Sequence, residues 1–181
     1  MDRAQLTASM ASGDRPEFLF FWGHTRTPGH AVGKWVLSQW WPVEFTVDGQ
    51  NYRSAEHFMM GEKARLFGDE EIRAKVLTSE TPADAKRLGR AVRGFDQDAW
   101  VAHRYDIVVR ASIAKFGQHQ QLREFLLATG DKVLVEAAPR DRIWGIGLGA
   151  ENPAAADPAQ WRGENLLGFA LMEARTALSA G

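Results

Sequence analysis

The stretch 52–63 constrains the fold of this chain more than any other segment. Immediately before it, Asp48-Gly49 is a turn signal of the kind that joins two short antiparallel strands. Ser54 is a residue type that favours the N-cap of a helix. The sequence therefore predicts a β-hairpin over 43–53 that leads directly into a helix over 55–67.

Within that helix, Glu56 and Lys63 are seven residues apart. At about 100° per residue they return to within ~20° of one another, two turns apart on one face. Met59 and Met60 lie between them. A carboxylate and an amine separated by apolar side chains indicate a polar site in a largely apolar pocket. Two solvated surface charges are the alternative explanation of the same spacing.

Further helices are predicted along the rest of the chain, with few strands. Capping residues and apolar periodicity predict a mainly α (α+β) domain of about six to eight helices, with a small β element near the N-terminus. We expect one domain over 17–181, preceded by a flexible polar leader over 1–16. The later helices are expected at 69–78, 81–92, 96–116, 118–128 and 163–178. Two further strands are expected at 18–22 and 133–137.

Composition excludes several classes of protein. The net charge of -1 gives no general attraction to nucleic acid, and the absence of cysteine excludes disulfides and thiolate chemistry. No apolar run approaches the ~20 residues of a membrane span, and the N-terminus lacks a signal-peptide core. We therefore expect a cytoplasmic protein. The five histidines show no metal-binding spacing, so no metal and no cofactor are expected.

Aromatic residues are concentrated near the N-terminus, where eight of the 19 lie between Phe18 and Phe45. Trp22-Gly23 and Trp40-Trp41 stand at predicted borders between strand and loop. Aromatic faces at such borders suit stacking on a planar ring such as a nucleobase. The core of a small β subdomain would use the same residues.

Two further clusters carry polar residues. Asp141 stands between Arg140 and Arg142, with Trp144-Gly145 close behind, a pattern that fits phosphate binding or a structural salt-bridge network. Asn165 precedes an apolar helix, where it fits a helix cap or a ligand contact. The basic run of Lys86, Arg87, Arg90 and Arg93 is interpreted as a solvated helix face rather than a phosphate site.

Several sequence blocks occur in an order that resembles one known family. They are Phe20-Phe21-Trp22-Gly23, Leu37-Ser38-Gln39-Trp40, Ser54-Ala55-Glu56-His57-Phe58-Met59, Lys63-Ala64, Ala85 to Arg90, Leu126 to Gly130, Leu134 to Ala137, Asp141 to Gly147 and Asn165 to Gly168. Together they are similar to the NADAR, or YbiA-like, family from about Phe18 to Leu178. Gln39-Trp40 departs from the family pattern of Asn before an aromatic.

The resemblance implies a mostly helical fold and an N-glycosidase that cleaves the bond between a ribose carbon and a nitrogen. Glu56, Lys63 and Asp141 match the family's polar site and are the predicted catalytic residues. In this hypothesis Glu56 transfers protons, Asp141 supports the sugar or its developing charge, and Lys63 forms a transient Schiff base. The roles of Glu56 and Asp141 are interchangeable. The predicted substrate-binding residues are Trp22, Gly23, Ser38, Trp41, Trp100, Arg142, Trp144, Gly145 and Asn165.

The resemblance also defines the candidate substrates. The first is a phosphoribosylamino-pyrimidine intermediate of riboflavin biosynthesis. The second is ADP-ribose attached to guanine, the one case in which nucleic acid would be a partner. A non-catalytic module that binds NAD or ADP-ribose is the alternative from another class. The expected partner is therefore a small ribosyl phosphate or ADP-ribosyl compound. No association with a membrane is expected.

Overall fold

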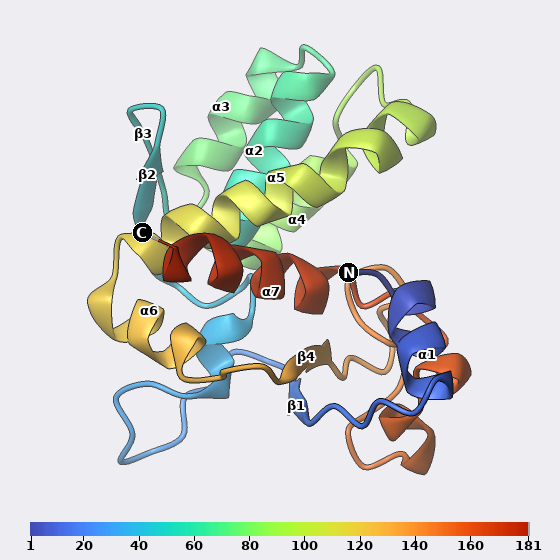
Figure 1. Cartoon of the computed structure of the whole chain (residues 1–181). Coiled ribbons are helices and arrows are strands. Elements are labelled where there is room, and N and C mark those ends of the chain that lie inside the picture. Colours follow the sequence, from blue (N-terminus) through green and yellow to red (C-terminus); the bar gives the residue numbers. More distant parts are fainter. Residues whose placement is uncertain (181) are drawn as a thin grey trace.

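The computed structural model describes residues 1–180, and within them the chain forms seven α-helices, three 3-10 helices and four short strands (Figure 1). The α-helices are α1 (Arg3–Ala11), α2 (Ala55–Leu66), α3 (Glu70–Thr78), α4 (Pro82–Arg90), α5 (Gln97–Gly117), α6 (Gln120–Leu127) and α7 (Leu166–Ser179). The strands are β1 (Phe18–Phe21), β2 (Phe45–Val47), β3 (Gln50–Tyr52) and β4 (Val133–Glu136), and the 3-10 helices are η1 (Lys34–Leu37), η2 (Pro153–Ala156) and η3 (Pro158–Gln160). The predicted mainly helical class is confirmed.

Side-chain caps fix where the central helices begin, as the sequence predicted. Ser54, Asp69, Thr81 and Asp96 each accept a hydrogen bond from the backbone N–H three residues later. These bonds satisfy donors that the first turn of a helix leaves without a partner. The start of α2 is thereby fixed directly behind the β2–β3 hairpin, in which Phe45 pairs with Tyr52.

The first and last strands form a parallel pair that the sequence did not predict. In the register of β1 and β4, Phe18 lies opposite Val133 and Phe21 opposite Glu136. Parallel strands end at the same edge, so the loop after Phe21 begins beside the loop after Glu136. Figure 1 shows β1 and β4 below α7, and their register places them side by side. This pairing brings two distant parts of the chain to one place.

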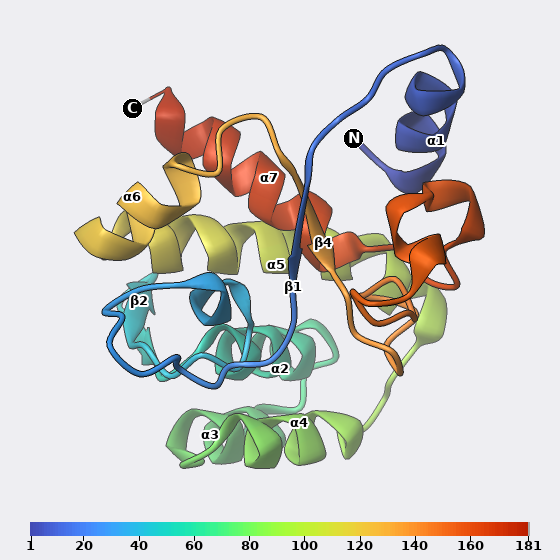
Figure 2. The same ribbon diagram turned by 90° about the horizontal axis from the view of Figure 1, so that it is seen from below.

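Helices form most of the core. The long helix α5 packs against α7 and α2, and α2 also packs against α3 and α4. In Figure 2, α3 and α4 form the outer layer on the side of α2 that faces away from α7. A second, smaller cluster of buried apolar residues lies under β4 and includes Val135, Ile146 and Trp161. The two clusters support opposite sides of β4.

The first residues of the chain, within the predicted leader over 1–16, include a short helix. Residues Arg3–Ala11 form α1, which begins with a capping box between Asp2 and Gln5. Leu6 is only 2% exposed and joins the smaller apolar cluster. Arg3 donates to the carbonyl oxygen of Pro158 over 3.0 Å. Met10 also packs against that cluster, so a few contacts and one cap hold this largely polar segment, and such signals are weak in the sequence.

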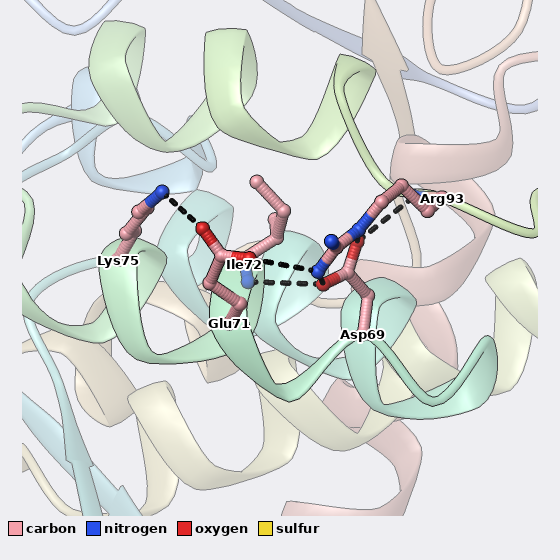
Figure 3. A network of polar contacts seen from close by, with 5 residues as sticks. All are labelled: Asp69, Glu71, Ile72, Lys75 and Arg93. Atoms are coloured by element: carbon pink, nitrogen blue, oxygen red, sulfur yellow. Dashed lines mark hydrogen bonds and ion pairs between the residues drawn. The ribbon is translucent and has the colours of Figure 1, made fainter.

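An ion-pair network anchors the connection between α4 and α5 (Figure 3). The buried carboxylate of Asp69 caps α3 at Ile72 and also accepts hydrogen bonds from the backbone and guanidinium of Arg93. The Arg93 side chain, by its hydrogen bonds, holds the pKa of Asp69 well below its usual range. Because Arg93 belongs to the α4–α5 connection, the network ties that connection to the start of α3.

Candidate active site

A cavity of about 960 Å³ opens between α2, α4 and the loops that follow β1 and β4. Helix α2 contributes Glu56, Met59, Met60 and Lys63 to its lining. The predicted polar face of this helix therefore points into one pocket, with the two methionines between the charges. Asp141 and Trp144 line the same pocket from the loop after β4.

Glu56 is the most deeply buried of the three predicted catalytic residues, with an exposed fraction of 2%. Its Oε1 atom has no hydrogen-bond partner within residues 1–180. Burial raises the pKa of the Glu56 carboxyl to about 7, and the charges of Lys86 and Arg90 only partly oppose this rise. A carboxyl with a pKa near neutrality can both accept and release a proton during a reaction.

Lys63 is held at the other end of the same helix face. Its Nζ donates a 2.8 Å hydrogen bond to the carbonyl oxygen of Gly89 in α4. The same Nζ lies 4.3 Å from the ring centroid of Phe95 and 5.6 Å from that of Trp100. Burial lowers the pKa of the Lys63 amine, which increases the fraction of the nucleophilic, uncharged form.

Asp141 combines a structural contact with its place in the pocket. Its Oδ1 atom accepts hydrogen bonds from the backbone N–H groups of Ile143, over 2.9 Å, and Trp144, over 2.8 Å. Within residues 1–180, these are the bonds that the Asp141 side chain makes. One oxygen thus shapes the turn, and the other is left to interact with a ligand.

Glu136, which sequence reasoning did not single out, is a third carboxyl in the lining. It ends β4, and its Oε2 atom is buried without a hydrogen-bond partner in the described part of the chain. Burial, and then the negative charges of Asp141 and Glu56, raise the pKa of the Glu136 carboxyl to about 8. A charged residue at the end of an otherwise apolar strand was the one signal in the sequence that pointed to it.

Three cationic side chains line the pocket. Lys86 and Arg90, one turn apart on α4, both line it, together with Arg140. The basic run of α4 is therefore divided between two environments. Arg87 forms an ion pair with Asp84 on the exposed side, and Arg93 belongs to the network of Figure 3. Half-buried Lys86 and exposed Arg90 thus face the pocket, whereas the sequence suggested only a solvated helix face.

Four tryptophans line the pocket: Trp22, Trp40, Trp100 and Trp144. Trp22 is 68% exposed, so its ring stands at the rim and is open to stacking. Gly23 and Ser38 also line the cavity as the sequence suggested. Trp41 does not, because its ring packs toward Trp35 at a centroid distance of 6.4 Å. The neighbouring Trp40 takes its place.

Three other predicted binding residues lie outside the lining. Arg142 is exposed, and Gly145 is buried where a Cβ would come within 2.9 Å of the Glu136 carbonyl oxygen. Asn165 neither caps α7 by its side chain nor reaches the cavity. Its amide instead accepts from the Glu136 N–H and donates to the Leu134 carbonyl, each over 2.9 Å. Gly145 and Asn165 therefore hold β4 in place behind the pocket.

Lys115 supports the wall formed by residues 38–40 from behind. It is fully buried in α5, and its Nζ donates to the carbonyl oxygens of Val36, over 2.6 Å, and Ser38, over 2.8 Å. Burial lowers the pKa of Lys115 to about 7. The next carbonyl group, that of Gln39, accepts the N–H of Glu56 over 3.0 Å. No local pattern indicates the Lys115 contact, because it joins residues far apart in the chain.

Comparison with known proteins identifies the same architecture elsewhere. The NADAR domain model matches residues 20–179. The chain is 40% identical over 164 residues to N-glycosidase R617 of Acanthamoeba polyphaga mimivirus, covering 88% of this chain and 95% of that protein. It is 33% identical over 139 residues to N-glycosidase YbiA of Escherichia coli (strain K12), covering 77% of each.

The fold also matches a solved structure. The NMR structure of the E. coli protein YbiA superposes with a TM-score of 0.73 at 28% identity, covering 92% of this chain and 88% of that one. A third relative, riboflavin biosynthesis protein VVA0006 of Vibrio vulnificus (strain YJ016), is 32% identical over 142 residues. That match covers 78% of this chain and 35% of the longer relative.

Proposed function

The chain belongs to the NADAR domain family, and we propose that it is an N-glycosidase that hydrolyses the bond between a ribose carbon and the nitrogen of a base. The observation that carries the proposal is the meeting of Glu56, Lys63 and Asp141 in one cavity. Breaking an N-glycosidic bond builds positive charge on the sugar and negative charge on the leaving nitrogen. A carboxylate, a proton donor and a nucleophile in one pocket match these needs.

The proposed reaction uses the amine of Lys63 as the nucleophile. In an aminoriboside the sugar ring can open, and C1 then has the oxidation level of an aldehyde. The uncharged Lys63 amine attacks C1, the base leaves with a proton, and the resulting Schiff base is hydrolysed by water. Glu56 transfers protons in these steps, and Asp141 supports the sugar hydroxyls or the developing cation. The last two roles are interchangeable in this proposal.

A phosphoribosylamino-pyrimidine of riboflavin biosynthesis is the proposed substrate. The cationic side chains of Lys86, Arg90 and Arg140 in the lining suit a phosphate group, because each offers charged hydrogen-bond donors. The tryptophan rings suit a planar base. The name of the Vibrio relative, a riboflavin biosynthesis protein, agrees with this choice of substrate.

ADP-ribose on guanine is the second candidate substrate. The cavity of about 960 Å³ lies at the upper end of the ~300–1,000 Å³ range of ligand pockets, which leaves room for a molecule larger than one nucleotide. Trp22 at the rim offers a face to a base outside the pocket. The net charge of -1 favours the small substrate, because binding nucleic acid needs a basic surface.

A side-by-side assay tests the proposal and separates these candidates. Purified protein is incubated with a phosphoribosylamino-pyrimidine or with ADP-ribosylated guanine DNA, and release of free base or free ADP-ribose is measured. Faster turnover of the first supports the proposed substrate, and faster turnover of the second replaces it. Saturable binding of ADP-ribose or NAD with no cleavage of either substrate would instead identify a non-catalytic binding module.

A further inference from the structure

Two carboxyl groups in the pocket each present a buried oxygen that has no partner among residues 1–180. These atoms are Oε1 of Glu56 and Oε2 of Glu136. Buried polar atoms in native proteins are nearly always hydrogen-bonded. Both groups face the same cavity, so the polar groups of a bound ligand are the natural partners. The proposed mechanism uses Glu56 and leaves Glu136 without a role.

The backbone of Glu136 is fixed on both sides. Its N–H donates to Oδ1 of Asn165, and its carbonyl oxygen accepts the N–H groups of Ala138 and Ile146, each over 2.9 Å. Its strand is paired with β1 up to this residue, since Phe21 lies opposite Glu136. A side chain that starts from so constrained a backbone is well placed to act with defined geometry.

We propose that Glu136 is the general acid of the reaction and that Glu56 is its base, a division of roles that rests on the proposed N-glycosidase activity. The C1–N bond breaks and its electron pair stays on nitrogen, which takes the proton of the Glu136 carboxyl. C1 of the ring-opened sugar bonds to the Lys63 amine, which passes one proton to Glu56 and its second proton to the departing nitrogen. Water later hydrolyses the Schiff base and restores the amine and both carboxyl groups to their starting states.

The surrounding charges explain why the two carboxyls take different roles. Glu136 faces the carboxylates of Asp141 and Glu56, and the positive charge of Lys86 offsets their effect on its pKa only in small part. Burial and the Asp141 carboxylate also raise the pKa of Glu56, but two cations, Lys86 and Arg90, oppose that rise. As the pH rises, Glu56 therefore ionises first. Glu136 keeps its proton to higher pH, because its carboxyl has a pKa of about 8.

Rates as a function of pH test this assignment on the intact protein. With a phosphoribosylamino-pyrimidine, wild-type kcat should fall as the pH rises through about 8, because the acid must be protonated. Glu136→Gln should lower kcat ~10²–10⁴-fold and remove that alkaline limb. Glu124→Gln, on the remote helix α6, is the matched control and should retain the wild-type profile.

Leaving-group dependence provides an independent readout. A ribosyl phosphate that releases 4-nitrophenolate needs no proton from the protein. If wild type cleaves this compound, Glu136→Gln should reduce the rate of its cleavage at least tenfold less than the rate with the amino-pyrimidine substrate. Equal losses of rate with the two substrates would overturn the assignment. A Glu136→Gln protein that keeps the alkaline limb would also overturn it. If that variant does not fold, the wild-type protein alone tests the assignment. A wild-type kcat that does not fall between pH 7 and 9.5 would reject Glu136 as the general acid. Failure of wild type to cleave any N-glycoside would reject the proposed function itself.

Discussion

Lys63 and Gly89 are joined across two helices by a 2.8 Å hydrogen bond from the amine to the carbonyl oxygen. Helix α2 thus supplies the amine, and α4 supplies the oxygen that orients it. Gly89 also lies where a Cβ would overlap the Met60 side chain, so the two helices approach closely at this point. The hydrogen bond leaves the lone pair of an uncharged amine free to attack a substrate.

Borohydride should trap a covalent adduct of the wild-type protein in the presence of substrate, because it reduces a Schiff base to a stable amine. Lys63→Arg is the matched variant, since it keeps a donor and a positive charge but has no nucleophilic amine at neutral pH. Mass spectrometry should find the adduct in wild type and none in the variant. Turnover by wild type without any trapped adduct would show that Lys63 acts by charge or hydrogen bonding alone.

Glu56→Gln should lower turnover ~10²–10⁴-fold, because the amide keeps the size of the side chain but transfers no proton. The variant should fold as wild type does, since it removes a buried carboxyl that has one oxygen without a partner in residues 1–180. Initial rates and thermal unfolding, measured on the same preparation, check both parts. Wild-type rates in the variant would remove Glu56 from the mechanism.

Two substitutions at Asp141 should distinguish its structural role from its chemical role. Asp141→Asn keeps an Oδ1 acceptor for Ile143 and Trp144 and should unfold like wild type, yet it should lose turnover. Asp141→Ala should in addition lose about 1–2 kcal/mol of unfolding free energy, because two backbone donors lose their acceptor. Chemical denaturation and rate measurements test the pair. Full activity in Asp141→Asn would leave the turn as the sole task of this residue.

Trp22 and Trp41 should respond oppositely to truncation. Trp22→Ala should weaken substrate binding by ~1–3 kcal/mol with little change in stability, because its exposed ring stands at the rim of the pocket. Trp41→Ala should destabilise the fold by ~1–3 kcal/mol and leave the affinity of the folded protein nearly unchanged. Calorimetric titration and denaturant unfolding give the two quantities. Equal affinity losses would mean that Trp22 has no special part in binding.

Lys115 should make stability depend on pH in an identifiable direction. Its pKa is about 7 when folded and should return to its ordinary value near 10.5 when unfolded. Between these values the unfolded chain binds a proton that the folded protein lacks, so the free energy of unfolding rises with pH. Compared with Lys115→Met, wild type should therefore gain stability from pH 7 to pH 10. Parallel curves for the two proteins would contradict this.

Local signals made the helical part of the fold predictable. Caps such as Ser54 and Asp96, and a turn such as Asp48-Gly49, act through neighbouring residues, and the elements begin and end close to where they indicated. The spacing of Glu56 and Lys63 likewise depends only on helix geometry. For this reason one face of the pocket was visible in the sequence.

Contacts between distant segments were not predictable in the same way. The pairing of β1 with β4 joins two four-residue strands that carry no mark of their partner. Asn165 holds β4 by its side chain from a left-handed backbone conformation, although its position suggested a cap. Glu136 looked like the end of a buried strand, because only the assembled pocket reveals what its carboxyl faces.

The parallel pairing of β1 with β4 also has a consequence for the order of folding. It joins the chain near residue 18 to the chain near residue 133, so the pocket depends on contacts of high sequence separation. Such contacts form late, since the entropy of closing a long loop opposes them until much of the chain is ordered. During synthesis from the N-terminus, the helices α2 to α5 can pack before the ribosome has delivered β4. Catalytic competence should thus be the last property that the nascent chain acquires.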